Sequence, residues 1–292
     1  MKSVGELGED GLIARVCGDL PKASQVVVGP GDDCAVVETG EDLVLLKTDA
    51  VVAGVHFVPD EKPERVGWKA VARVLSDFAA MGGEPGELLV TLVLDPGVSL
   101  DWVDGLYQGM NACLNQHGGV IVGGETTSLP PGAPTMISVA GKGSVIRTNL
   151  VTRSGGRAGD GIYVTGKLGR SIHGKHLDFT PRLREANWLV RSGSITAMMD
   201  LSDGLAKDLP RLARMSKVGF ELDRESIPCS EGSTTAQALS DGEDYELLFT
   251  SGDDLRSAWR EKFPELALSK IGTLTEGQGD SVEGGWDHFQ RE

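Results

Sequence analysis

The sequence has few cysteines and no long apolar segment. Its four cysteines are widely spaced and form no C-x-x-C pair: Cys17, Cys34, Cys113 and Cys229. This spacing predicts reduced thiols and argues against disulfides and zinc sites. No apolar run approaches the ~20 residues of a membrane helix, and the first residues lack the apolar segment of a signal peptide. We therefore expect a cytoplasmic protein that does not insert into membranes.

Basic residues are also scarce. The 292 residues include 28 Lys and Arg against 43 Asp and Glu, so the formal net charge is −15. A surface of this charge repels nucleic-acid phosphates and anionic lipids, which argues against both as partners. A polyanionic small molecule would need metal ions between itself and this protein.

Short apolar runs alternate with amphipathic stretches along the chain, which predicts an α/β fold. Runs typical of strands include Leu43–Lys47, Leu88–Leu94 and Gly161–Thr165. Helical spacing is found in Val66–Met81, after a predicted Ser99 cap, and from about residue 202 onward. Prolines and glycines around residues 126–161 predict a boundary between two α/β domains, residues 1–148 and 149–292.

Acidic residues occupy the predicted ends of strands and starts of helices, where ligands gather in α/β proteins. Two carboxylates about 5 Å apart repel by roughly 3 kcal/mol, so a larger group needs cations between its members. Oxygen ligands favour Mg²⁺, which can also bind phosphate oxygens during phosphoryl transfer. The alternative is that these acids only cap helices and turns. The residues are Asp32, Asp33, Asp49, Asp77, Glu125, Asp200 and Asp203.

Other candidate motifs are weaker. Gly161–Leu168 is one residue short of a Walker A loop and lacks its hydroxyl, and Gly29-Pro30-Gly31 lacks the third glycine of a dinucleotide fingerprint. His173 and His176 lie in a basic loop, and we interpret them as a surface pair.

Several segments together resemble the thiamine-monophosphate kinases, which belong to the family that includes aminoimidazole ribonucleotide synthetase. The similarity covers nearly the whole chain, with the motifs in family order. The segments are Gly29–Val36, Lys47–Phe57, Gly67–Pro85, Gly123–Thr127, Thr152–Gly166, Asp200–Leu209, Ala238–Thr250 and Trp286–Phe289.

This resemblance implies that ATP phosphorylates thiamine phosphate to thiamine diphosphate by direct in-line transfer, without a catalytic base. It also implies that the N-terminal α/β domain pairs in a homodimer to form a β-barrel, beside a C-terminal α/β domain. By motif, the Mg²⁺ ligands would be Asp33, Thr48, Asp49, Asp77, Glu125, Asp200 and Asp203. The ATP contacts would be Tyr107, Gly124, Glu125, Arg153 and Ser202, and the thiamine phosphate contacts His56, Glu243 and Trp286.

Three positions depart from the family pattern. Lys47 stands where a metal-binding serine is usual, Val74 replaces a usual Asn, and Glu125 replaces a usual Asp. The Lys47 ammonium is therefore a candidate to replace one metal ion. Two alternatives stay open: a related ATP-using synthetase of the same superfamily, and a weakly catalytic module that binds nucleotide or thiamine phosphate.

Overall fold

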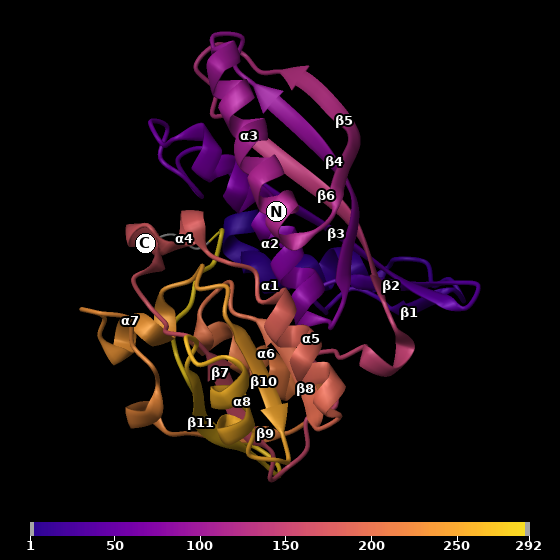
Figure 1. The fold of residues 1–292 in the computed structure, drawn as a ribbon, viewed down its shortest axis with the longest axis vertical. Coiled ribbons are helices and arrows are strands. Elements are labelled where there is room, and N and C mark those ends of the chain that lie inside the picture. The colour runs from indigo at the N-terminus through magenta and orange to yellow at the C-terminus, as the bar shows by residue number, and fades with distance from the viewer. Residues whose placement is uncertain (1–2, 290–292) are drawn as a thin grey trace.

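The computed structural model describes residues 3–289, which form two β-sheets with helices packed around them (Figure 1). The first sheet has six strands in the order β1-β2-β3-β6-β4-β5. Only the β4–β5 pair within it is parallel. Its strands are β1 Val26–Val28, β2 Ala35–Thr39, β3 Asp42–Val52, β4 Glu84–Leu94, β5 Val120–Ser128 and β6 Met136–Val145.

The second sheet has five antiparallel strands in the order β8-β10-β7-β11-β9. It follows the first sheet in sequence and packs around a separate apolar core. Its strands are β7 Gly161–Thr165, β8 Ile195–Asp200, β9 Gly219–Leu222, β10 Leu247–Ser251 and β11 Leu268–Thr275. The mixed α/β prediction is confirmed, while the boundary at residue 148 stays a prediction.

Helices α2 (Pro63–Ala80) and α3 (Leu100–His117) pack against each other and supply the apolar side chains that bury one face of the first sheet (Figure 1). Pro63 occupies the first turn of α2, where a missing amide proton costs nothing. The Ser99 hydroxyl accepts a hydrogen bond from the Trp102 amide, which confirms the predicted cap of α3. Because α2 also contacts β8 and α5 (Leu183–Ser192), it joins the two halves.

The remaining helices surround the second sheet and the junction between the halves. None of the helices within residues 3–289 is long and apolar enough to cross a membrane. They are α1 Val4–Gly18, α4 Lys175–Asp178, α6 Leu205–Ser216, α7 Thr235–Ser240 and α8 Arg256–Lys262, with single 3₁₀ turns at Arg147–Asn149, Ser171–His173 and Arg224–Ser226.

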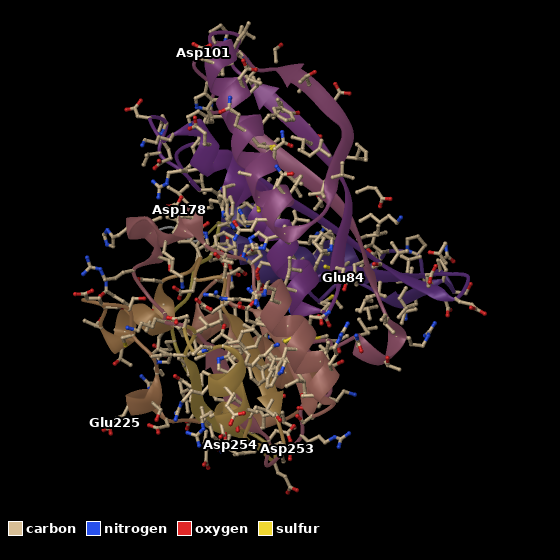
Figure 2. All side chains as sticks on the ribbon, in the orientation of Figure 1. Glu84, Asp101, Asp178, Glu225, Asp253 and Asp254 are labelled. Carbon is tan, nitrogen blue, oxygen red and sulfur yellow. The ribbon has the colours of Figure 1, made fainter. Side chains whose placement is uncertain are left out.

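Acidic side chains cover the outside of both halves (Figure 2). Asp101 marks one end of the molecule, at the start of α3, and Asp253 and Asp254 mark the opposite end. Asp254 is about half exposed and pairs with Arg256 at the surface. The acids at the junction of the two sheets are in a different environment.

Candidate active site

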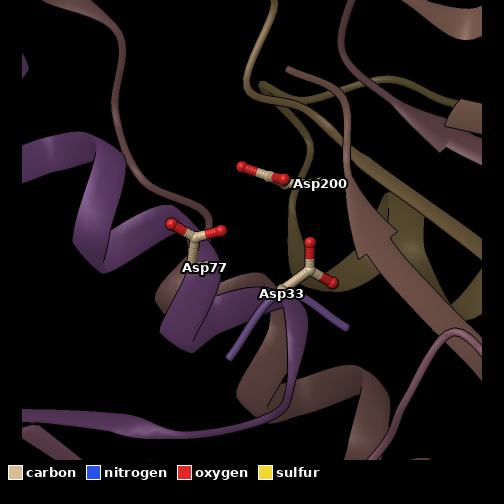
Figure 3. Close-up of side chains that lie close together, drawn as sticks. All are labelled: Asp33, Asp77 and Asp200. Carbon is tan, nitrogen blue, oxygen red and sulfur yellow. The ribbon is translucent and has the colours of Figure 1, made fainter. Parts of the chain in front are cut away.

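Three aspartates from distant parts of the sequence meet between the two sheets (Figure 3). Asp33 follows the turn after β1, Asp77 lies on α2, and Asp200 ends β8. All three are buried, and one carboxylate oxygen of each lies within 4.8 Å of the others. The three come from three of the segments whose acids we expected to converge.

Burial and mutual repulsion disfavour the charged form of this trio. Burial, and next the neighbouring Asp33, raise the pKa of Asp200 to about 7. Burial also raises the pKa of Asp77 well above its usual range, and Asp49 and Asp200 add to that rise while Lys47 opposes it. A divalent cation would relieve both effects. Three carboxylates without sulfur or imidazole form a hard donor set, which fits Mg²⁺.

Two basic side chains form ion pairs with carboxylates of the trio. The Lys47 ammonium lies 2.8 Å from Asp77 Oδ1, and Arg153 Nη2 lies 2.6 Å from Asp33 Oδ1. Burial would lower the pKa of Lys47, but Asp49 and Asp77 raise it above its usual value, so the ammonium stays charged. The Ser76 hydroxyl donates to Asp200 at 2.5 Å and fixes that carboxylate.

A cavity of about 710 Å³ lies beside this cluster, and its lining includes Lys47 and Arg153, which pair with two members of the trio. Its volume is within the range of small-molecule sites. The first half, the second half and α1 all contribute to its wall. The predicted residues that line it are Asp49, His56, Arg153, Ser202, Asp203, Glu243 and Trp286, joined by Asp32 and Lys47.

His56 is buried on the cavity wall just after β3. Its Nδ1 accepts a hydrogen bond from the Val52 amide at 3.1 Å, so the proton of the neutral ring is on Nε2. Burial, and next the charge of Arg73, lower the pKa of His56 to about 3. His56 is therefore a neutral hydrogen-bond donor at physiological pH.

Glu243 lies in a network with two buried side chains. Its carboxylate is 2.7 Å from the Lys69 ammonium and 3.0 Å from His176 Nδ1. Burial would raise the pKa of Glu243, but the hydrogen bond from His176 and the charge of Lys69 hold it at about 2. The interpretation of His176 as a surface residue is wrong, because α4 turns its ring inward against Lys69.

Trp286 reaches the same cavity from the last described segment. Its amide donates to the Asp203 carbonyl at 2.8 Å, and its ring nitrogen lies 3.3 Å from His288 Nδ1. Trp286 is 41% exposed, and its ring also contacts that of His288 edge-on.

Seven predicted site residues lie outside the lining of this cavity, and three of them form the buried trio. Side chains alternate along β3, so Lys47 and Asp49 face the cavity while Thr48 Oγ1 lies 3.4 Å from Ser138 on the opposite face. Gly124 and Glu125 are exposed on β5, an edge strand, and Tyr107 on α3 packs beside the first core. Glu125 therefore does not join the trio within this chain, and its role as a metal ligand stays a prediction.

Asp203 also lies apart from the trio, although it lines the cavity. Arg211 Nη1 lies 2.6 Å from its carboxylate and the Lys207 ammonium 3.3 Å. Asp208 sits beneath this loop and accepts from the amides of Ser202 and Asp203. These bonds fix the loop that follows β8 at the cavity wall.

Sequence reasoning missed two contributors to the cavity, Arg73 and the acidic face of α1, and it missed Lys69, which is buried behind Glu243. Arg73 and Lys69 were visible as charges on an otherwise apolar helix, four residues apart. Glu9 and Asp10 of α1 line the cavity and pair with Lys207 and Arg211.

Family comparisons agree with this geometry. The AIR synthase related protein N-terminal domain matches residues 31–145, and the corresponding C-terminal domain matches residues 160–285. Thiamine-monophosphate kinase from Salmonella typhimurium is 36% identical over 91% of this chain and 87% of its own length. The Aquifex aeolicus enzyme is 34% identical over 97% of this chain and 99% of its own.

The chain belongs to the thiamine-monophosphate kinase family. Among solved structures, AaThiL complexed with AMPPCP and TMP superposes with a TM-score of 0.86 at 32% identity, covering 99% of each chain. The two-sheet fold therefore matches that of this relative over nearly the whole chain.

Proposed function

We propose that this chain uses ATP to phosphorylate thiamine phosphate, giving thiamine diphosphate and ADP. The observation that carries the proposal is a single cavity with two chemically different ends. One end is lined by Lys47 and Arg153, which pair with the buried carboxylate trio, so a metal-bound triphosphate would lie there. The other end has His56, Glu243 and Trp286 for a cationic heteroaromatic phosphate ester. Relatives of this length and identity are thiamine-monophosphate kinases.

The proposed reaction is a direct in-line transfer. A phosphate oxygen of thiamine phosphate attacks the γ-phosphorus of ATP, and the bond from that phosphorus to the β–γ bridging oxygen breaks, so ADP leaves with the electron pair. This chemistry depends mainly on positioning and charge neutralisation, so no strong base is required. His56 Nε2–H would donate to the acceptor, and Glu243 would accept from the aminopyrimidine.

Mg²⁺ would be held by Asp33, Asp77 and Asp200, and when bound it neutralises the phosphate oxygens. Arg153 is fixed by Asp33 beside this centre and is positioned to contact the triphosphate. The resemblance supports the further roles. These are Thr48, Asp49, Glu125 and Asp203 as additional metal ligands, and Tyr107, Gly124, Glu125 and Ser202 as nucleotide contacts.

A homodimer is part of the proposal. Helices α2 and α3 cover one face of the first sheet, while on the other face Leu46, Leu89 and Val122 are 44%, 50% and 57% exposed. No helix within residues 3–289 packs on these side chains. Pairing with the same face of a second copy would bury them and close the two sheets into the expected barrel. The cytoplasmic location remains a prediction from the cysteines and charge.

An assay with a matched pair of variants tests the function. We expect the protein with ATP, Mg²⁺ and thiamine phosphate to form ADP and thiamine diphosphate in equal amounts, and a chelator to stop the reaction. Asp200→Asn removes one trio charge, so we expect at least about a 100-fold fall in kcat. Asp254→Asn, at an exposed carboxylate, should leave kcat unchanged.

Three results would contradict the proposal. Binding of both substrates without any turnover would favour the binding module. Turnover with a different acceptor would favour a related synthetase. A fully active Asp200→Asn enzyme with normal Mg²⁺ dependence would remove the trio from the mechanism, provided circular dichroism shows the fold intact.

A further inference from the structure

Helix α2 carries a row of three charged side chains at the junction of the two sheets, and the middle one lines the cavity. Lys69, Arg73 and Asp77 are spaced four residues apart, so they lie on one face of the helix, about 6 Å apart along its axis. The positions between them are buried and largely apolar. The row is therefore a distinct polar stripe and not part of a solvated helix face.

The two ends of the row are already assigned to different parts of the site. Lys69 pairs with Glu243 at 2.7 Å, at the end proposed for thiamine. Asp77 belongs to the carboxylate trio, at the end proposed for the metal and ATP. Arg73 is the middle member, and the acids that stabilise its charge include Asp49 on one side and Glu243 on the other.

The Arg73 guanidinium has unused hydrogen-bonding capacity. Its side chain is only 12% exposed and lines the cavity. Nη1 donates to the Ala50 carbonyl at 2.9 Å, whereas Nε is buried and has no hydrogen-bond partner among the described residues. The nearest carboxylate oxygen to Nε, Asp49 Oδ2, is 3.6 Å away. A guanidinium that lines the cavity and uses only part of its donor set within the protein can bind an anion there.

We propose that Arg73 binds the phosphate of the acceptor substrate, thiamine phosphate, and so selects the phosphorylated vitamin over thiamine. This inference rests on the proposed function. In-line transfer requires the acceptor phosphate to lie next to the γ-phosphate, between the thiamine end and the metal end. On α2, Arg73 lies between Lys69 at the thiamine end and Asp77 at the metal end. A guanidinium also matches a phosphate through paired N–H donors and offsets the repulsion between two approaching phosphates.

Calorimetric titrations with two ligands test this role. We expect Arg73→Met to raise the Kd for thiamine phosphate about 30-fold in the presence of Mg²⁺, which corresponds to about 2 kcal/mol. The Kd for thiamine, which has no phosphate, should change less than threefold. Binding of AMPPCP should also stay within threefold, because Arg153 and the trio serve the donor nucleotide. Arg73→Lys keeps the positive charge but loses the paired N–H donors of the guanidinium. Its Kd for thiamine phosphate should therefore lie between those of the wild type and Arg73→Met.

Arg65→Met is the matched control, because Arg65 lies two turns earlier on α2 and pairs outside the cavity with Glu61 and Asp178. It should leave the preference for thiamine phosphate over thiamine unchanged. Equal losses for both ligands in Arg73→Met, or no loss, would overturn the role of Arg73 while the kinase activity of the wild type still stood. A wild-type protein that does not bind thiamine phosphate would overturn the proposed function and this inference together.

Discussion

A lysine within a group of carboxylates acts as a permanent local cation. Lys47 lies 2.8 Å from Asp77, faces the same side of β3 as Asp49, and keeps its charge because both acids hold its pKa up. At this distance the ammonium occupies space that a second metal ion bridging Asp49 and Asp77 would need. The remaining carboxylate group is Asp33, Asp77 and Asp200.

Removal of this ammonium should therefore create room for another divalent ion. We expect Lys47→Ser to bind one more Mn²⁺ per chain than the wild type, counted by electron paramagnetic resonance of free Mn²⁺ during a titration. Lys142→Ser is the control, because Lys142 is exposed and pairs with Glu87 at the surface of the same sheet. An unchanged Mn²⁺ count in Lys47→Ser would show that the ammonium does not take the place of an ion.

The residues that sequence reasoning identified best are the acids of the trio. Asp33 and Asp200 were expected at strand ends and Asp77 on an otherwise apolar helix, and the fold brings the three together. Arg73 was missed because an arginine on a helix is usually solvated, and only the packing of α2 between two sheets shows that it is enclosed. The same packing buries His176, which sequence context placed at the surface.

At the scale of elements, the position of α2 depends on its close contact with α3. A Cβ added to Gly109 would lie 1.8 Å from the Glu64 carbonyl oxygen, and one added to Gly67 would lie 1.9 Å from the Leu106 carbonyl oxygen. Each glycine thus lets the backbone of the other helix approach. Since α2 carries Lys69, Arg73 and Asp77, this contact fixes the position of these three side chains relative to α3 and the first sheet.

An alanine at this crossing should force the helices apart. We expect Gly109→Ala to lower the free energy of unfolding by about 3 kcal/mol, because an overpacked contact against backbone cannot relax by a rotamer change. Denaturation with guanidinium chloride measures the change. Gly18→Ala, where a Cβ meets no atom within 4 Å, should shift stability by less than about 1 kcal/mol. Equal stability of the two variants would contradict the close contact.

The sequence predicted elements with a cap or a continuous apolar run better than elements without one. Helix α3 was located from its cap and apolar spacing, and β7 has the predicted ends, Gly161 and Thr165. Strands β2 and β9 were missed because their formation depends on pairing with a longer neighbour. Helix α1 was missed because glycines interrupt it, including Gly8 with a φ of 72°.

At the scale of the whole molecule, composition and motif order indicated a mixed α/β protein, but not how its halves meet. The cavity depends on α2 lying between sheets that share no strand pairing among the described residues. Such long-range packing leaves no periodic signal in the sequence. The pairing of two chains is also not visible in the sequence, because exposed apolar residues on a sheet face have the same alternation as buried ones.

The uncovered face of the first sheet allows a direct test of the proposed homodimer. Leu89 lies on β4, on the side away from α2 and α3, and is half exposed. Leu89→Glu would place a charge in the centre of the dimer interface. The cost of desolvating a carboxylate there, about 3 kcal/mol or more, should raise the dimer Kd at least about 100-fold. Sedimentation equilibrium should then show monomers at concentrations where the wild type is dimeric.

Leu100→Glu is the matched control for this change. Leu100 is 81% exposed, more than Leu89, but it lies at the start of α3, where a glutamate is favourable and the sheet face is not involved. If exposure alone decided association, Leu100→Glu would dissociate the protein as readily as Leu89→Glu. Dissociation by Leu89→Glu alone requires that the β4 face is the one that pairs. A wild-type protein that sediments as a monomer would exclude the barrel, and Tyr107, Gly124 and Glu125 would then have to act on the surface of a single chain, away from the cavity.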